Sequence, residues 1–279
     1  MSRLALRTFV TLTALLVPSA AFGSFHFMQI EQIIGGVNGD PTAQAVQLRM
    51  RLSGQGQVQF GRLVAHDAAG NNPVVLATFS GPVPNGTGRV LIASSSFASY
   101  TSPAAVADKI MSAVIPASYL AAGSLTWEDS SGVTIYWRVS WGGASYTGSG
   151  AGSTTNDSDG NFNPPIASAL PSSNLFAVKF TGAASAQSTN NAADYALTTS
   201  AAVFTNNAPA SFTVTTPPCS TTPGDMNGDT VINGADIAKF VNCAVNNTPG
   251  VVGCTCSDQD HNGILDSSDI NAFVTQLLS

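Results

Sequence analysis

Two stretches near the end of this 279-residue chain place acidic and amide side chains at a spacing that suits a hard cation. Residues 225–236 read DMNGDTVINGAD, and residues 258–269 read DQDHNGILDSSD, so matching positions recur 33 residues apart. Ca²⁺ prefers about six to eight oxygen ligands, and a 12-residue loop supplies them from positions 1, 3, 5, 7, 9 and 12. The repeat therefore predicts two calcium ions, one in each loop.

The ligands of each predicted calcium loop follow from these positions. In the first loop they are Asp225, Asn227, Asp229, the carbonyl of Val231, Asn233 and Asp236. In the second they are Asp258, Asp260, Asn262, the carbonyl of Ile264, Asp266 and Asp269. Position 6 requires a sharp turn, which Gly263 suits, whereas Thr230 at that position predicts a strained or weaker first loop. The alternative is a duplicated polar turn that binds no metal.

The same apolar pattern follows both loops and predicts a helix after each. Its members recur at i, i+3, i+4, i+7 and i+8: Ile237, Phe240, Val241, Ala244 and Val245, then Ile270, Phe273, Val274, Leu277 and Leu278. One stripe per helix predicts that the two helices pack face to face. Residues 225–279 carry seven Asp and one Lys, so the segment repels itself unless a cation offsets the charge. Metal binding is therefore expected to drive its folding.

This segment resembles a type I dockerin in its motif D-x-N-G-D-x-x-I-N-x-x-D-I and the second copy, each with Asp at position 12. The resemblance implies an EF-hand-like module that binds two Ca²⁺ and docks onto a cohesin-like module of a scaffold or cell-surface component. It also implies partner contacts at positions 10 and 11 of each loop, which are Gly234, Ala235, Ser267 and Ser268. The two copies differ at these positions, which argues against a swapped, dual binding mode.

The four cysteines of the chain all lie near its C-terminal end: Cys219, Cys243, Cys254 and Cys256. An even number in a secreted segment predicts two disulfides. A bond between Cys254 and Cys256 would close a strained small ring, so we expect these two to pair with Cys219 and Cys243, in either order. A zinc site is the alternative, but no His stands at a ligand spacing from Cys254 and Cys256.

The N-terminal residues 1–23 have the pattern of a secretory signal peptide. Arg3 and Arg7 precede a short apolar run at 9–17, and small residues follow at the expected cleavage point. A buried N-terminal helix is the alternative. Later apolar runs stay well below the about 20 residues that a transmembrane helix needs, so we expect no transmembrane anchor. The predicted location is secreted, either extracellular or at the cell surface.

Composition excludes several classes of protein. Charged residues make up 9% of the chain and the net charge is −6, which argues against a nucleic-acid binder. The apolar share of 44% is enough for a real core. We expect a signal peptide at 1–23, a β-sandwich domain at 24–215, a linker at 216–224 and a dockerin-like calcium-binding module at 225–279.

Short strands separated by Gly, Asn and Pro turns are expected throughout 24–215. Their ranges are 27–34, 45–52, 57–66, 73–79, 88–94, 124–129, 133–141, 175–181 and 212–216. Alternation is clearest in two of them. It places inward Val46, Leu48, Met50 and Leu52, then Val133, Ile135, Trp137, Val139 and Trp141. One helix is expected at 102–113, with Ser102 as its cap.

Residues 27–95 resemble a lamin-tail-type immunoglobulin-like domain. The resemblance rests on MQIEQIIGGVNGDPTAQAVQLRMRL, in which a Gly/Asn/Asp turn joins two strands, and on the closing strand GTGRVLIAS. Gln47 stands where that family has Glu. The resulting fold class is mainly β: an immunoglobulin-like β-sandwich followed by a small α-helical dockerin/EF-hand-like module. Domains of the resembled kind act as binding or scaffolding modules.

Evidence for an enzyme is sparse in the sequence. The neighbouring Glu128 and Asp129 are interpreted as a solvated turn rather than a catalytic pair. Trp127, Trp137, Trp141, Tyr136 and Tyr146 could stack on a sugar, but their strand positions favour core packing. The segment 157–161 (DSDGN) is interpreted as a polar turn, with a surface calcium site as the alternative. We therefore expect a non-enzymatic surface or scaffold-associated protein; the alternative is a carbohydrate-binding or polysaccharide-degrading component of an extracellular complex.

Overall fold

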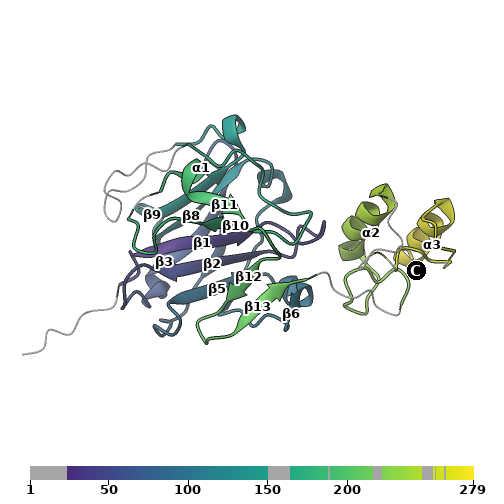
Figure 1. The fold of residues 1–279 in the computed structure, drawn as a ribbon, viewed down its shortest axis with the longest axis horizontal. Coiled ribbons are helices and arrows are strands. Elements are labelled where there is room, and N and C mark those ends of the chain that lie inside the picture. Colours follow the sequence, from purple (N-terminus) through teal and green to yellow (C-terminus); the bar gives the residue numbers. More distant parts are fainter. Residues whose placement is uncertain are drawn as a thin grey trace, which may run out of the picture.

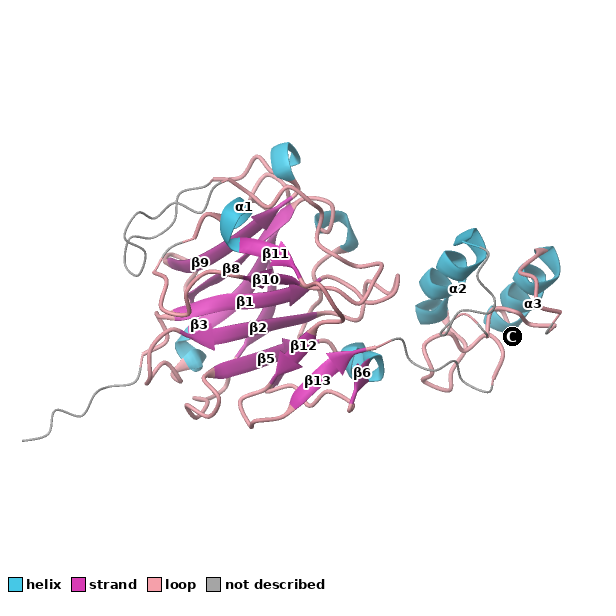
Figure 2. Cartoon of the chain, viewed as in Figure 1, coloured by secondary structure: helices cyan, strands magenta, loops and turns pink. Residues whose placement is uncertain are grey.

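The computed structural model describes residues 24–149, 164–187, 189–215, 222–246, 254, 256–260 and 262–279. Strands dominate 24–215, here called the β region, and the two long helices belong to 222–279, the C-terminal segment (Figures 1 and 2). The expectation of a mainly β chain is confirmed. The predicted signal peptide, the 157–161 turn and most of the predicted linker lie outside the described residues.

Six strands form the largest sheet, in the order β11-β10-β1-β2-β5-β7. They are β1 (Met28–Ile34), β2 (Ala45–Met50), β5 (Arg89–Ala93), β7 (Lys109–Ile110), β10 (Val178–Phe180) and β11 (Tyr195–Leu197). Neighbouring strands are antiparallel except β5 and β7, which pair in parallel. The pairing of β1 with β2 shifts register between Ile30 and Gln32, so that Glu31 lies at a bulge.

A four-stranded sheet, in the order β4-β3-β8-β9, packs on one face of the larger sheet through a shared apolar core. Its strands are β3 (Gly61–His66), β4 (Val74–Thr78), β8 (Gly123–Asp129) and β9 (Ile135–Trp141). Trp127, Trp137 and Trp141 are fully buried in this core, and the Trp137 indole N–H donates to the Tyr195 hydroxyl at 2.7 Å. Core packing, the favoured role of these tryptophans, is confirmed.

A three-stranded sheet, in the order β12-β13-β6, covers the other face of the six-stranded sheet. Its strands are β6 (Thr101–Ser102), β12 (Val203–Thr205) and β13 (Ser211–Val214). Leu91 of β5 points into this second core, whereas its neighbours Val90 and Ile92 point into the first. The short helix η2 (Ser95–Tyr100) closes the second core with Phe97, whose ring lies 5.3 Å from that of Phe204.

Some polar side chains of the six-stranded sheet are buried because both faces of that sheet are covered. Glu31 is 2% exposed and pairs with Arg49 at 3.1 Å and Arg89 at 2.8 Å. The Gln47 amide donates to the same carboxylate at 2.7 Å. These bonds supply the partners that a buried charge requires.

The smaller helices lie between strands. They are η1 (Val58–Phe60), η3 (Ala117–Tyr119), η4 (Gly143–Ser145) and α1 (Asn191–Asp194). All nine strands predicted from the sequence overlap observed strands, and β6, β7, β11 and β12 were not predicted. Two residues expected to point inward are exposed: Leu52 at 55% and Val133 at 83%. Each lies beyond the end of its strand, and Val133 belongs to a turn in which its N–H donates to the Asp129 carboxylate at 3.1 Å.

The helix expected at 102–113 is wrong. The segment is extended and ends in β7, which pairs with β5. The Ala105 N–H donates to Thr101 Oγ1 at 2.7 Å, and the Asp108 carboxylate accepts from the Leu91 N–H at 2.7 Å. These side-chain bonds hold the backbone in a non-helical path.

The C-terminal segment consists of two loops, each followed by a helix. The helices are α2 (Gly234–Asn246) and α3 (Ser267–Leu277). The rings of Phe240 and Phe273 stack with centroids 4.0 Å apart and form the centre of a small core with Met226 and Cys243. Among the described residues, no helix has both the length and the apolarity needed to cross a membrane.

Candidate calcium site

The two loops of the C-terminal segment share one hydrogen-bond pattern. At position 12, Asp236 Oδ1 accepts from the Met226 N–H at 2.7 Å, and its Oδ2 accepts from the Asn233 N–H at 2.9 Å. In the second loop, Asp269 Oδ1 accepts from the Gln259 N–H at 2.7 Å, and its Oδ2 accepts from the Asp266 N–H at 3.0 Å. The last carboxylate of each loop therefore ties the start of the loop to the start of the helix.

The first carboxylate of each loop is held in the same way. Asp225 Oδ2 accepts from the Thr230 N–H at 2.8 Å, and Asp258 Oδ2 accepts from the Gly263 N–H at 2.8 Å. Thr230 and Gly263 occupy position 6 and have φ angles of +73° and +82°. The predicted sharp turn is thus present in both loops, and in the first it places a β-branched residue in the left-handed region, which is costly.

Positions 3 and 5 contribute amide or carboxylate oxygens on the inner side of each turn. Asn227 Oδ1 accepts from the Asp229 N–H at 2.9 Å. In the second loop, Asp260 Oδ1 accepts from the Asn262 N–H at 3.1 Å, and Asn262 Oδ1 accepts from the Ile264 N–H at 2.8 Å. These bonds fix where the oxygens lie without using up their second lone pairs.

Position 9 begins each helix. Asn233 Oδ1 accepts from the Ala235 N–H at 2.7 Å, and Asp266 Oδ1 accepts from the Ser268 N–H at 2.7 Å. Asp266 is the N-cap of α3 and forms a capping box with Asp269. The ninth side chain therefore caps a helix, which agrees with the frequent use of a bridging water at this position of calcium loops.

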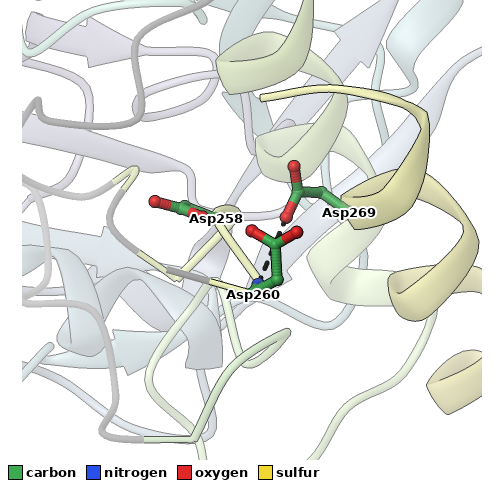
Figure 3. A group of neighbouring side chains, drawn as sticks. All are labelled: Asp258, Asp260 and Asp269. Carbon is green, nitrogen blue, oxygen red and sulfur yellow. Dashed lines mark hydrogen bonds between the residues drawn. The ribbon is translucent and has the colours of Figure 1, made fainter. Parts of the chain in front are cut away.

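The second loop gathers three carboxylates around a common point. Ligand oxygens of Asp258, Asp260 and Asp269 all lie within 4.8 Å of one another. Figure 3 shows the three side chains side by side, with the 3.4 Å bond from the Asp260 N–H to Asp269 as a dashed line. Two oxygens on one Ca²⁺ can be at most about 5.2 Å apart, twice the longest usual Ca–O distance. This cluster could hold such an ion.

Burial makes these charges costly without a cation. Asp225, Asp236 and Asp269 are fully buried, and Asp258 is 8% exposed. Burial raises the pKa of Asp236, and the nearby negative charge of Asp225 also raises it, against the effect of the backbone N–H donors. Buried carboxylates of like charge are stabilised by coordination to a metal. The oxygen-only donor set is suited to a hard cation such as Ca²⁺ rather than to zinc.

The carbonyl residues at position 7, Val231 and Ile264, have side chains that are 54% and 56% exposed. Position 8 turns inward instead, because Ile232 and Leu265 pack against the small core of the segment. The predicted partner-binding residues at positions 10 and 11 lie in the first turn of each helix. Gly234, Ser267 and Ser268 are exposed and Ala235 is half-buried.

The helical stripes meet at Phe240 and Phe273, as expected, but they do not pack along their whole length. Only part of each stripe contacts the other helix, and much of the remainder lines an open apolar groove of about 330 Å³. We call this the α2–α3 groove; its residues are Ile237, Phe240, Val241, Ala244, Val245, Ile270, Phe273, Val274 and Leu277. The exposed fractions of Ile237, Val241, Ile270 and Val274 lie between 44% and 49%. The helices contact each other mainly through the stacked phenylalanine rings, and most of the other residues of each five-residue stripe are left uncovered.

The cysteines agree with one of the two predicted pairings. Cys243 and Cys254 form a disulfide with their Cα atoms 5.6 Å apart. Cys256 is buried beside them in the core of the segment, and Cys219 lies outside the described residues. Because the sulfur of Cys254 is in a disulfide, it cannot supply the thiolate of the alternative zinc site.

Glu128 does not lie in a solvated turn. It belongs to β8, is 3% exposed, and pairs with Arg62 at 2.7 Å. Its other oxygen accepts from the Thr126 hydroxyl at 3.0 Å, and Thr126 in turn contacts His66 Nε2 at 3.1 Å. Asp129 is used within the following turn, where its carboxylate accepts from the Thr134 N–H at 3.1 Å. Both carboxyl groups are therefore used in an ion pair and in hydrogen bonds that stabilise the β region.

Comparisons of the chain with models of protein families, with curated proteins and with solved structures found no match.

Proposed function

We propose that this is a secreted, non-enzymatic protein whose C-terminal segment binds two calcium ions and docks onto a cohesin-like module of a scaffold or cell surface. The observation that carries the proposal is the equivalence of the two loops: carboxylates at positions 1 and 12 accept backbone N–H groups at equivalent places in both. A polar turn that serves only to reverse the chain has no need of two buried carboxylates per loop.

The proposed partner contacts combine two features of the segment. The exposed first turns of α2 and α3 carry Gly234, Ala235, Ser267 and Ser268, as the resemblance to type I dockerins implies. The α2–α3 groove adds an apolar surface beside them. Exposed apolar patches rimmed by polar residues are typical of protein–protein interaction sites. In this proposal, the β region acts as an immunoglobulin-like binding or scaffolding domain that the segment anchors.

Titration calorimetry of the full chain tests the calcium part of this proposal. We expect two Ca²⁺ per chain, with the Asp236→Asn and Asp269→Asn variants each losing one of them. A chelator should abolish the helical circular dichroism of the C-terminal segment and expose 222–279 to protease, while 24–215 stays resistant. If the chelator changes neither signal, the disulfide rather than the metal holds the segment, and the proposal fails.

The partner part needs a separate experiment. A pull-down from the surface fraction of the host, with and without Ca²⁺, should capture a protein only with Ca²⁺. The variants Ile237→Asp and Ile270→Asp place a charge in the α2–α3 groove and should abolish capture without reducing calcium uptake. Capture that persists in both variants would contradict a role for the groove.

The alternative of a carbohydrate-binding function is not favoured by a specific observation. The aromatic residues considered for sugar stacking, among them Trp127, Trp137 and Trp141, are buried in the core of the β region.

A further inference from the structure

The C-terminal segment contacts the β region through the first loop and one side of α2. A Cβ atom built on Gly39 would lie 3.4 Å from the Asn242 Cβ and 3.7 Å from the Ala238 carbonyl oxygen. A cleft of about 260 Å³ is lined by Asn227 and Asp229 of the first loop and by residues of η2, namely Ser95, Ser96, Ser99 and Tyr100. In Figure 1 the segment lies beyond the edge formed by β6 and β13.

Lys239 of α2 also takes part in this contact. It is fully buried, and its Nζ lies 5.8 Å from the centroid of the Tyr100 ring, which is also fully buried. Lysine is almost never fully buried without partners. An ammonium group within about 6 Å of an aromatic face gains a cation–π attraction that grows as water is excluded. The burial of Lys239 and Tyr100 therefore depends on contact between the C-terminal segment and the β region.

Charges from both parts surround Tyr100. Burial is the main cause of the raised pKa of Tyr100, and the nearby charge of Asp40 also raises it. Asp236 and Asp229 raise it further from the side of the C-terminal segment. Carboxylates of both parts of the chain therefore act electrostatically on Tyr100, the residue that Lys239 contacts.

The contact surface and the α2–α3 groove lie on opposite sides of α2. Successive residues of a helix are rotated by about 100°. Lys239 is therefore about 200° from Ile237, on the far side of the helix, while Val241 is within about 40° of Ile237. One helix can thus be held by the β region on one face and present the groove on the other.

We propose that the β region is an intramolecular partner of the C-terminal segment. It holds Lys239 and the side of the first loop that carries Asn227 and Asp229. The α2–α3 groove, the exposed first turns of both helices and the second loop stay open to an outside partner. This inference depends on the proposed function only for the identity of the outside partner. The two loops also differ in their surroundings: one side of the first loop faces the β region, and the second loop does not line that cleft.

Amine labelling of the full chain in Ca²⁺, resolved by peptide mass spectrometry, tests this proposal because the chain has three lysines. Lys179 is exposed and Lys109 is half-buried, so they serve as internal standards. We expect Lys239 to be labelled at least about tenfold more slowly than Lys179, as for a group that reacts only on local opening. Equal labelling rates of Lys239 and Lys179 would overturn the proposal.

A matched pair of variants shows whether the β region causes the protection. Asn242→Trp places a bulky side chain where α2 contacts Gly39, and it should raise the labelling rate of Lys239 toward that of Lys179. Asn242→Ala removes bulk at the same position and should keep Lys239 protected. Equal protection of Lys239 in both variants would assign its burial to the C-terminal segment itself and overturn the proposal.

Backbone ¹⁵N relaxation gives an independent reading. Amides of α2 and α3 should report the same rotational correlation time as those of β8; a much shorter time for the helices would also overturn the proposal. Calorimetry on the same samples measures calcium uptake separately. A chain that protects Lys239 but takes up no calcium would refute the proposed function and leave this inference standing.

Discussion

Position 6 of the two loops offers a direct test of how backbone strain would limit the proposed calcium binding. Thr230 and Gly263 adopt nearly the same left-handed conformation, with φ angles of +73° and +82°. An L-residue pays roughly 1–2 kcal/mol in this region, and Gly does not. The Thr230 side chain is exposed, so its removal loses little packing. The substitution Thr230→Gly therefore isolates the cost of the backbone conformation.

The expected gain is smaller than the strain itself. Glycine adds freedom to the unfolded loop, which offsets about 0.5–1 kcal/mol. A net gain of about 0.5–1 kcal/mol remains, and at about 1.4 kcal/mol per tenfold it corresponds to about two- to fivefold tighter binding. Calorimetry of the full chain should show this gain in the first loop alone. The melting temperature of the C-terminal helices in calcium should rise with it.

The reciprocal variant is Gly263→Thr in the second loop. A Cβ atom at Gly263 would have no atom within 4 Å, so the substitution adds strain without a collision. With the same offset from the unfolded loop, it should weaken the second loop by about 0.5–1 kcal/mol, which is about two- to fivefold. If Thr230→Gly fails to tighten binding while Gly263→Thr has no effect, strain at position 6 does not set the affinity of these loops, and the reasoning is refuted.

Three further predictions concern stability. Glu31→Gln should lower the free energy of unfolding of the β region by about 2–4 kcal/mol, since Arg49 and Arg89 lose their shared counter-charge. Urea unfolding measures this loss. A loss no larger than that of Glu128→Gln, which removes the counter-charge of Arg62 alone, would contradict the prediction. Burial is the main cause of the lowered pKa of His66. The β region should therefore keep the full contribution of this group above about pH 6.5 and lose up to about 1.4 kcal/mol per pH unit as the pH falls from there toward the lowered pKa, and His66→Gln should reduce this dependence. A wild-type and variant difference that is constant from pH 7 to about pH 5 would exclude this sign. Cys243→Ala/Cys254→Ala removes a disulfide with a sequence separation of 11, and thermal or urea unfolding should show the C-terminal segment destabilised by about 3 kcal/mol. Calorimetry should still show two calcium ions per chain. Loss of one calcium ion would contradict this expectation and would show that the disulfide shapes a loop.

Alternation and turn chemistry were enough to place the long strands, because each has a wide apolar face against the first core. Val46 and Leu48, for example, are fully buried as predicted. The three-stranded sheet was not predicted as a layer. Of its strands only β13 was expected, since β6 and β12 have two and three residues and β12 buries a single apolar side chain, Phe204. The burial of Glu31 and Gln47 follows from that layer, so a single strand could not reveal it.

The loops were the most predictable part of the candidate site, because their acidic and amide residues are close in sequence and their positions depend on one local turn. The α2–α3 groove was predicted as core, since an apolar stripe does not say whether its partner is in the same chain. Lys239 gave no signal of burial, because its partner Tyr100 is 139 positions earlier in the sequence. Contacts between distant parts require the folded chain.

The dual use of position 9 couples each helix to its loop. Asn233 closes the first loop and also caps α2, and Asp266 does both for the second loop and α3. The rotational phase of each helix is therefore set by the loop before it. One residue inserted directly after Asn233 would turn the rest of α2 by about 100° and swing Phe240 away from Phe273. The spacing from loop to aromatic ring thus tolerates substitutions far better than a change in length.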